Sequence, residues 1–565
     1  MNRKQRRQQE KNNDKILDAA RAGKDIPLPQ ALEMMVSSYE KGNREKAYKV
    51  ACGVMKVMPD DIDVLHFAGT VALELGQFEN ALDHLEKAVT VKPDHAEAWN
   101  GLGHAYLALK RIEPGIEACQ KAVGLLNDMP EAHYNLGNAL SAAGRMEEAL
   151  QSFTVALEHK PAFPEALNNM GNALQGLRRF EEAADAFRRA IKINPAFTIA
   201  RFNLANALMA AGKPKQAIAA YRDSIEANPK HLPSYNNLAT VYRQIGQLPE
   251  SAEVYRQALK IDDTVAELHN NLGVVLQDCG VAGEAAACFK RALELAPRNA
   301  EAAFNLHAAV FDDTDLAPAT EALEQALAVD PGHERAHFML GAIEDHAGIA
   351  KDAETHFAAL PRDGDGPHPA IDSWSYMKAA RGPDTRWFAP ASATLHYCLR
   401  HASATGAVLE FGVRYGATLR LIAADAGQPV HGFDSFQGLP EDWYSERKGS
   451  YTTFGELPDM PDTVTLHAGW FEDTLPAYTA EFDDPVRFMH VDCDLYTSTV
   501  TIFDHLATRI RPGTVIVFDE YLINPGWRDD EFKAFREAVE KHGWEYEYIA
   551  FSLFAKQAGV RITKT

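Results

Sequence analysis

Residues 490–499 read His-Val-Asp-Cys-Asp-Leu-Tyr-Thr-Ser-Thr, and this stretch sets the fold of the C-terminal part of the chain. The apolar run from Val486 to Val491 stops at two carboxylates, Asp492 and Asp494, which are spaced i and i+2. In an extended chain that spacing points both side chains to one face. The run is typical of a buried strand, and the apolar residues 500–506 after it are helix-like.

The same pattern returns further along the chain. Another apolar run, Thr514–Phe518, ends at Asp519 and Glu520. Two buried strands with a helix between them form a βαβ unit, whose strands are parallel. Both acid pairs then lie at the carboxyl edge of a sheet, where α/β folds bind ligands. We therefore expect an active site at these acids.

Length, charge and cysteine usage bound the class of protein. A chain of 565 residues predicts two or more domains. A net charge of −22 argues against a nucleic-acid partner, because phosphate binding requires a basic surface. The six cysteines form no CxxC pair, which fits a reducing cytoplasm better than a disulfide framework or a zinc site. No apolar run approaches the ~18–20 residues of a membrane span, so we expect no transmembrane segment and a cytoplasmic location.

The first 26 residues form a basic tail. Residues 1–10 lack the apolar core of a secretory signal, so we do not expect one here. Two interpretations are open: a solvated, disordered tail, or a weak electrostatic tether to acidic lipid or to a partner.

Residues 27–360 repeat with a period of 34. Pairs of the Leu-Gly type begin at Leu102, Leu136, Met170, Leu204, Leu238, Leu272, Leu306 and Leu340. In most repeats a small residue follows 13 positions later, an aromatic residue follows after four more, and a proline closes the unit. Small residues let two helices approach, aromatic rings fill the space between them, and proline ends the helix.

This pattern resembles the tetratricopeptide repeat, a helix–turn–helix unit that stacks into a superhelix. We count nine repeats and a degenerate first one, and we place each repeat by the 34-residue period. Repeats of this kind bury their apolar faces only against their neighbours, and they bind partners rather than carry chemistry. The resemblance implies an all-α superhelix over residues 27–360.

An asparagine precedes the Leu or Met of the pair in six successive repeats: Asn135, Asn169, Asn203, Asn237, Asn271 and Asn305. This position resembles the one that faces the concave groove of such arrays. An asparagine ladder there offers donors and acceptors to the backbone of an extended peptide. The superhelix of O-linked N-acetylglucosamine transferase looks similar in this respect. The alternative is that asparagine is a common consensus residue with no binding role.

The periodicity stops at residues 361–390, which are rich in helix breakers and which we interpret as a linker. Residues 391–565 then alternate strands and helices, which predicts an α/β domain with a largely parallel sheet. We expect strands at 407–412, 430–433, 464–467, 486–491, 514–518, 545–551 and 553–562, and helices at 392–401, 417–426, 500–506 and 527–542.

A glycine turn at the end of the first strand suggests a ligand. Gly412 and Gly416 would let a ligand approach the backbone and the N-terminus of the next helix. Their spacing is neither GxGxxG nor that of a P-loop. Asp434 closes the second strand, where an acid can hold ribose hydroxyls. An adenosine ligand without a pyrophosphate fits this combination, and S-adenosylmethionine fits best.

Five motifs occur in order: Glu410–Gly416, Phe433–Pro440, Gly469–Pro476, Asp492–Thr499 and Asp519–Tyr521. Together they resemble the macrocin O-methyltransferase family, which methylates sugar hydroxyls of antibiotics with S-adenosylmethionine and magnesium. The resemblance covers nearly all of residues 391–565. One position departs from it, because the family usually has Asp-Asp-Tyr where this chain has Asp519-Glu520-Tyr521.

The resemblance implies a set of site residues. Glu410, Gly412 and Gly416 would border the methionine portion of the cofactor, Asp434 the ribose, and Trp470 with Phe471 the adenine; Ser435 and Asp492 complete the cofactor set. Asp492, Asp494, Asp519 and Glu520 would hold Mg2+ or Mn2+, and the first three would be catalytic. The cation would bind the acceptor hydroxyl and stabilise the developing alkoxide. His490, His467 and the acids are candidates for the group that takes the proton.

Three functions follow from these features. The chain is an O-methyltransferase whose repeats recruit a protein or a glycosylated acceptor, an O-methyltransferase of a free glycan whose repeats assemble it with other enzymes, or an adaptor whose methyltransferase domain is weak or inactive. The complete set of acids favours the first two. A homo-oligomer is also left open.

Overall fold

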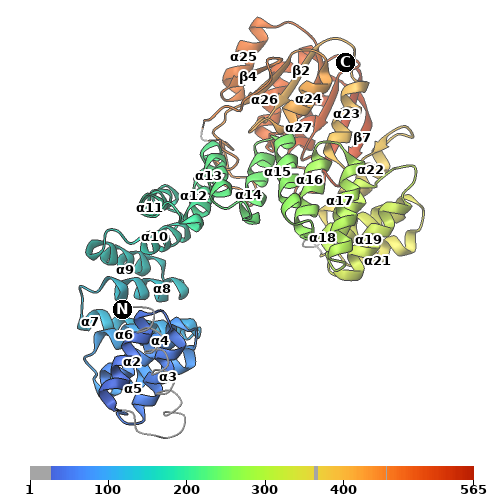
Figure 1. Ribbon diagram of the computed structural model, residues 1–565. Coiled ribbons are helices and arrows are strands. Elements are labelled where there is room, and N and C mark those ends of the chain that lie inside the picture. The colour runs from blue at the N-terminus through green and yellow to red at the C-terminus, as the bar shows by residue number, and fades with distance from the viewer. Residues whose placement is uncertain (1–26, 362–366, 454) are drawn as a thin grey trace. The chain divides into compact units, whose positions relative to one another are not determined.

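The computed structural model describes residues 27–361, 367–453 and 455–565 (Figure 1). The basic tail, with its two interpretations, and residues 362–366 of the interpreted linker lie outside the described residues. The chain divides into two units, Met1–Ala227 and Asn228–Thr565, and each is treated by itself. In the described ranges no helix combines the length and the apolar character that crossing a bilayer requires.

The first unit consists of paired antiparallel helices. Their bounds are α2 Leu28–Glu40, α3 Arg44–Met55, α4 Ile62–Glu74, α5 Phe78–Val91, α6 Ala96–Ala108, α7 Ile112–Leu125, α8 Pro130–Ala142, α9 Met146–His159, α10 Pro164–Gly176, α11 Phe180–Ile193, α12 Thr198–Ala210 and α13 Pro214–Ala227. Each helix packs on the next one in the chain, as the 34-residue period predicts.

One contact explains why the Leu-Gly pair recurs. A Cβ added to Gly137 would lie 2.6 Å from the ring of Phe153, and one added to Gly171 would lie 2.6 Å from the ring of Phe187. The glycine therefore makes room for an aromatic ring of the partner helix. Where the repeat has Ala205 instead, the ring belongs to Tyr221, whose hydroxyl donates to Asn206 Oδ1 at 2.5 Å.

The second unit begins with four more helix pairs: α14 Leu232–Gln244, α15 Leu248–Ile261, α16 Ala266–Asp278, α17 Ala282–Leu295, α18 Ala300–Ala309, α19 Ala317–Val329, α20 Glu334–His346 and α21 Ala350–Ala358. The same packing recurs, since a Cβ on Gly273 would lie 2.6 Å from the ring of Phe289. The described part of the array thus contains ten helix pairs.

Within the segment 361–390, the residues that the structure describes include a helix and a short strand. Helix α22 covers Pro369–Ala380 and strand β1 covers Arg386–Trp387. Trp374 and Trp387 are 1% and 2% exposed, and the Trp387 ring stacks on Phe551 with 5.6 Å between centroids. Arg386 donates two hydrogen bonds to Asp313 of the array, at 2.6 and 2.5 Å. These residues therefore join the repeats of the second unit to the C-terminal domain.

The C-terminal domain is built on one eight-stranded sheet. Its strands are β1, β2 Ala407–Phe411, β3 Val430–Asp434, β4 Val464–Ala468, β5 Val486–Val491, β6 Val515–Phe518, β7 Glu545–Ser552 and β8 Gln557–Lys564. They are ordered β1-β7-β8-β6-β5-β2-β3-β4, and only β8 runs antiparallel to its neighbours. The carboxyl ends of β2 to β6 therefore share one edge of the sheet.

Helices cover both faces of this sheet (Figure 1). Helices α23 Ala391–His401 and α24 Ala417–Ala426 bury Leu395, Leu399, Leu419 and Ile422 against Val408 and Phe488. On the other face lie α25 Phe471–Glu481, α26 Tyr496–Leu506 with the 3-10 turn Ala507–Arg509, and α27 Glu531–His542. A repeat superhelix joined to an α/β methyltransferase-like domain was the predicted fold class, and it is confirmed.

Several local expectations were wrong or incomplete: α26 begins at Tyr496 rather than at residue 500, and helices α22 and α25 were not predicted. The last strand begins at Gln557 rather than Leu553, because residues 553–556 form a tight turn in which Lys556 has a φ of 59°. The last helix begins at Glu531 rather than Trp527, because Gly526 has a φ of 67° and the chain turns there. The two-residue strand β1 was not predicted, since so short a run has no detectable alternation.

Candidate active site

The glycine turn after β2 brings two strand ends together. Gly412 has a φ of 95°, and a Cβ on it would lie 1.7 Å from the carbonyl oxygen of Asp492 at the end of β5. Gly416 has a φ of 75° and precedes the first residue of α24. Both positions therefore require glycine, and they place the N-terminus of a helix, with its unpaired N–H groups, at the carboxyl edge of the sheet.

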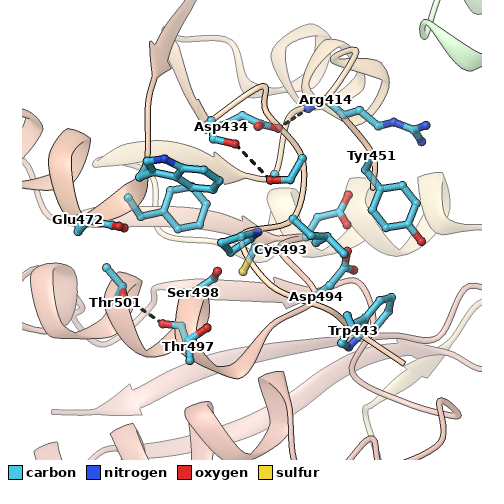
Figure 2. A pocket seen from close by; sticks show the side chains of 18 of the residues that line it. Arg414, Asp434, Trp443, Tyr451, Glu472, Cys493, Asp494, Thr497, Ser498 and Thr501 are labelled. Carbon is cyan, nitrogen blue, oxygen red and sulfur yellow. Dashed lines mark hydrogen bonds between the residues drawn. The ribbon is translucent and has the colours of Figure 1, made fainter. Parts of the chain in front are cut away.

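A cavity of about 580 Å³ lies at that edge. Of the predicted residues, Gly412, Asp434, Ser435, Trp470, Phe471, Asp492, Asp494 and Glu520 line it, whereas Glu410, Gly416 and Asp519 are not among its lining residues. The structure thus brings residues from β2 to β6 and the loops after them into one pocket. Figure 2 shows Glu472 at one end of it and Tyr451 with Asp494 at the other.

Asp434 ties two loops of the pocket together. One carboxylate oxygen accepts the backbone N–H of Arg414 at 2.6 Å (Figure 2), and the other accepts that of Phe436 at 2.6 Å. Arg414 and Phe436 both have positive φ angles, of 50° and 58°. Bonds of this kind, to an ionised acceptor, are strong enough to hold such loops in place.

The four acids lie where the two βα junctions predict them. Asp492 and Asp494 follow β5, and Asp519 and Glu520 follow β6. Burial, with the charges of Glu520 and Asp519, raises the pKa of Asp494 to about 7. Burial and the charge of Asp519 also raise the pKa of Asp492 well above its ordinary value. The carboxylates therefore repel one another, and the cluster favours a cation.

Two of the acids already have partners. Asp519 Oδ1 accepts from Gln557 Nε2 at 2.5 Å. Glu520 accepts from Asn524, and its Oε2 lies 3.0 Å from Lys556 Nζ. In the described ranges, no three His, Cys, Asp or Glu side chains are arranged to hold a metal ion as they stand.

His490 and Glu410 lie beneath the pocket. His490 Nδ1 is 3.0 Å from Glu410 Oε1, and Nε2 is 3.5 Å from Asp519 Oδ1. Burial lowers the pKa of His490, but the hydrogen bonds and charges of Asp519 and Glu410 outweigh burial and hold it well above its ordinary value. Neither residue lines the cavity, so His490 is placed to orient Asp519 rather than to meet an acceptor.

His467, the other histidine candidate, lies in β4 and does not line the cavity. Its Nε2 is 3.1 Å from His431 Nδ1, and its ring stacks on Phe433 with 4.5 Å between centroids. It packs within the sheet face rather than at the carboxyl edge. Of the proposed proton acceptors, only acids therefore line the pocket.

Several lining residues were not predicted, among them Arg414, Trp443, Tyr451 and Glu472. Arg414 lies inside the quoted glycine motif, where its position between the two glycines was the available signal. Trp443 and Tyr451 come from the long loop between β3 and β4, whose path the sequence pattern does not fix. Trp443 Nε1 donates to Asp530 Oδ2 at 3.2 Å, which holds the loop near α27.

The asparagine ladder makes contacts between repeats. In the first unit Asn135 Nδ2 donates to Asn100 Oδ1 at 2.8 Å, and Asn169 Nδ2 donates to Asn138 Oδ1 at 2.8 Å. Asn203 donates in the same way to Asn168 at 3.0 Å. In the second unit Asn271 and Asn305 repeat the contact with Asn236 and Asn270, at 2.9 and 3.2 Å. The amides therefore tie neighbouring repeats together, and of those named here Asn305 is buried and the other four ladder residues are half-buried.

Comparison with known families agrees with both halves of this architecture. A methyltransferase-domain model matches residues 409–521. Tetratricopeptide-repeat models match residues 68–130, 130–163, 168–231, 202–266, 266–299 and 308–367.

Three curated proteins are similar to part of this chain. Mycinamicin III 3''-O-methyltransferase of Micromonospora griseorubida is 30% identical over 185 residues, which are 27% of this chain and 70% of that protein. 8-demethyl-8-(2,3-dimethoxy-alpha-L-rhamnosyl)-tetracenomycin-C 4'-O-methyltransferase of Streptomyces olivaceus is 27% identical, over 27% of this chain and 64% of that protein. Demethyldecarbamoylnovobiocin O-methyltransferase of Streptomyces niveus is 31% identical, over 18% of this chain and 45% of that protein.

Solved structures similar to the chain include MamA and YrrB, the latter described as a TPR protein with an unusual peptide-binding site. MamA matches 29% of this chain and 95% of its own, at 25% identity and a TM-score of 0.27. YrrB matches 33% of this chain and 96% of its own, at 22% identity and a TM-score of 0.29.

Proposed function

We propose that this chain methylates a sugar or glycan hydroxyl with the help of a divalent cation. The chain belongs to the O-methyltransferase family of these relatives, and it joins their domain to a tetratricopeptide-repeat array. Methyltransferases of this family use S-adenosylmethionine. The observation that carries the proposal is the single cavity in which the glycine turn, Asp434 and the Trp470-Phe471 pair meet Asp492, Asp494 and Glu520.

The cofactor is assigned to the part of the pocket formed by the ends of β2, β3 and β4. Asp434 holds the ribose hydroxyls, because each oxygen that accepts a backbone amide keeps a second lone pair. Trp470 and Phe471 border the adenine, with Ser435 beside the ribose. Gly412 and Gly416 let the methionine portion approach the N-terminus of α24, and Asp492 faces it from β5. Glu410, buried behind the turn, supports this end without lining the cavity.

The acids are assigned to the cation. Their donor chemistry fits Mg2+ or Mn2+, which prefer oxygen ligands. In the described part of the chain, the buried atoms without a hydrogen-bond partner include Glu410 Oε2, both oxygens of Glu531 and His490 Nε2. Asp492, Asp494 and Asp519 would hold the ion. Glu520 would join them only by releasing Lys556, since that ion pair occupies it now.

The residues in and around the pocket have different parts in the proposed reaction. A bound divalent cation supplies Lewis acidity that makes a sugar hydroxyl a better nucleophile. Trp443 and Tyr451 line the acceptor end of the pocket. Asp494 lines that end and is placed to meet the acceptor hydroxyl, whereas both histidine candidates lie outside the cavity. Gln557 and His490 orient Asp519, and this fixed geometry contributes through proximity and orientation.

The repeats are assigned to recruitment of a protein or glycosylated acceptor. The outward side of the asparagine ladder supplies the contacts, while its inter-repeat bonds keep the groove in register. The alternative of an adaptor with an inactive domain is less well supported, because the glycine turn and all four acids are intact. The six free cysteines, three of them buried, fit the reducing cytoplasm assumed for this reaction.

The test is transfer of labelled methyl groups. The full chain is incubated with methyl-labelled S-adenosylmethionine and a lysate that lacks this enzyme, and the product is hydrolysed. We expect label in an alkali-stable methyl ether of a sugar. Label in an alkali-labile methyl ester or on nitrogen would overturn the acceptor class. A variant with Asn169, Asn203 and Asn237 changed to alanine should lose transfer to the macromolecular acceptor but keep S-adenosylmethionine binding.

A further inference from the structure

The repeat turn at Gly246, between α14 and α15, is packed against the methyltransferase domain. Gly246 is buried and has a φ of 69°. A Cβ added to it would lie 2.6 Å from the Cα of Ala417 and 2.7 Å from Arg420 Nη1, both in the first turn of α24. At the equivalent turns, Gly144 and Gly348 have φ angles of 76° and 80°, and nothing lies within 4 Å of an added Cβ. The close contact is therefore a feature of this turn rather than of the repeat.

Other repeats carry side chains at the same position of the turn. Lys110 and Arg178 are equivalent to Gly246 by the repeat period, and their φ angles are 58° and 59°. The left-handed turn therefore does not by itself require glycine, although glycine adopts it at the lowest cost. At Gly246 it is the first turn of α24 that leaves no room for a side chain.

The Arg420 side chain connects this repeat turn to the glycine turn after β2. Its Nη1 donates to the carbonyl oxygen of Ile245, at the end of α14, at 3.2 Å, and to those of Tyr415 and Gly416 at 3.0 and 3.2 Å. Its Nη2 donates to the carbonyl oxygen of Asp459 at 2.6 Å. One half-buried guanidinium therefore joins the array, the glycine turn and the segment before β4.

The segment before β4 also lies directly on the glycine turn. A Cβ on Gly416 would lie 2.6 Å from Met460 Sδ, and Met460 packs against the core that contains Leu419. A shift of Arg420 therefore displaces the glycine turn and this segment together. A lysine would not reproduce these contacts, because its ammonium group cannot reach carbonyls in several directions as a planar guanidinium does.

We propose that Arg420 is a positioning residue for S-adenosylmethionine, and that through it the repeat turn at Ile245 and Gly246 is part of the cofactor site. This rests on the function proposed above, which places the methionine portion at Gly412 and Gly416. The array then has a second role besides recruitment, because it holds the glycine turn in place. Coupling between two sites is reciprocal, so a cofactor that orders the glycine turn also stabilises the repeat turn.

Cofactor binding by the full chain tests this directly. Dissociation constants for S-adenosylmethionine and for 5'-methylthioadenosine, which lacks the amino-acid portion, are measured by calorimetry for the wild type, Arg420→Lys and Gly246→Ala. The matched controls are Arg400→Lys, exposed on α23, and Gly348→Ala, in a turn of the same left-handed φ. We expect Arg420→Lys and Gly246→Ala each to weaken S-adenosylmethionine binding by about tenfold or more, the scale of lost hydrogen bonds to a charged group. Binding of 5'-methylthioadenosine should be unchanged, and both controls should bind as the wild type does.

The choice of ligands separates positioning from a structural role. A general loosening of the domain would weaken both ligands alike, whereas a displaced glycine turn weakens only the one with the amino-acid portion. The double variant should bind S-adenosylmethionine about as weakly as either single variant, because the two changes act on one contact. Unchanged S-adenosylmethionine affinity in both single variants, or equal losses for both ligands, would overturn the inference and leave the proposed function standing. A wild type that binds neither ligand would overturn both.

A measurement on the wild type alone keeps the proposal testable if a variant does not fold. Amide hydrogen exchange is followed with and without S-adenosylmethionine. We expect the cofactor to slow exchange at residues 412–416 and also at residues 243–248, with no change at the turn that contains Gly348. Slower exchange at residues 412–416 with none at residues 243–248 would contradict the coupling between the array and the cofactor site.

Discussion

Asp434 shows how one side chain can serve both the fold and the ligand. It accepts amides from the loops after β2 and β3 and also lines the cavity. We predict that Asp434→Ala weakens S-adenosylmethionine binding by roughly 1.5–3 kcal/mol, the scale of hydrogen bonds to a charged group. Calorimetry on the full chain measures this, with Asp462→Ala, an exposed acid before β4, as the control. An unchanged dissociation constant would place the nucleoside elsewhere.

His307 is a residue whose burial makes stability depend on pH. It is 0% exposed, packs against Phe304 and Phe554, and burial lowers its pKa to about 4. An exposed histidine titrates near ~6.5, so the unfolded chain binds the proton more tightly. The folded state therefore loses stability as pH falls below that value, by about 2 kcal/mol at pH 5 for this group alone.

We predict that His307→Leu removes this part of the pH dependence. Six of the seven tryptophans lie in the second unit, so tryptophan fluorescence during urea unfolding reports mainly on that unit. The wild type should lose about 2 kcal/mol more than the variant between pH 7.5 and 5, by the linkage just described. The exposed His401→Leu serves as the control. Parallel losses in wild type and His307→Leu would show that His307 is protonated in the folded state.

At the scale of elements, the repeat is held together by the glycine–ring contact. Alanine is the better helix former, yet a Cβ on Gly171 would lie 2.6 Å from the Phe187 ring. We predict that Gly171→Ala destabilises the array by about 1–3 kcal/mol, the cost of overpacking. Gly53→Ala is the matched control, because nothing lies within 4 Å of its Cβ, and it should stabilise by up to about 1 kcal/mol. Circular dichroism during urea unfolding measures both, and equal effects would contradict the packing argument.

The sequence was most informative about the bounds of individual helices and strands. Helix α24 was predicted at its observed bounds, and β2, β3 and β5 to within a residue, because their apolar periods are local. The pairing of Glu520 with Lys556 was not predictable, since the lysine lies 36 residues away in a turn whose path depends on β7 and β8. Glu531 was missed because its neighbours Asp529, Asp530 and Lys533 are charged, as at an exposed helix start, whereas its own side chain is buried.

At the scale of the whole molecule, the described part of the segment 361–390 makes the repeats of the second unit and the C-terminal domain fold together. Trp374 and Trp387 are buried between the array and the sheet, Trp387 stacks on Phe551, and Arg386 binds Asp313. A fragment of residues 391–565 would leave Phe551 and Phe554 exposed. We predict that it unfolds without cooperativity or aggregates, whereas residues 228–565 unfold cooperatively. Tryptophan fluorescence during denaturation compares them, and a cooperative, soluble 391–565 fragment would contradict this interface.

The central claim, methyl transfer to a hydroxyl with metal assistance, is tested most directly by one assay. Transfer of labelled methyl groups from S-adenosylmethionine to the acceptor fraction is measured for the full chain after dialysis, with excess EDTA and then with added Mg2+ or Mn2+. We predict that EDTA abolishes transfer and that either ion restores it. Asp519→Asn should cut turnover strongly at unchanged S-adenosylmethionine affinity, and the exposed control Asp529→Asn should behave as the wild type. Full turnover in excess EDTA would contradict the account and leave catalysis to an acid of the pocket without a metal.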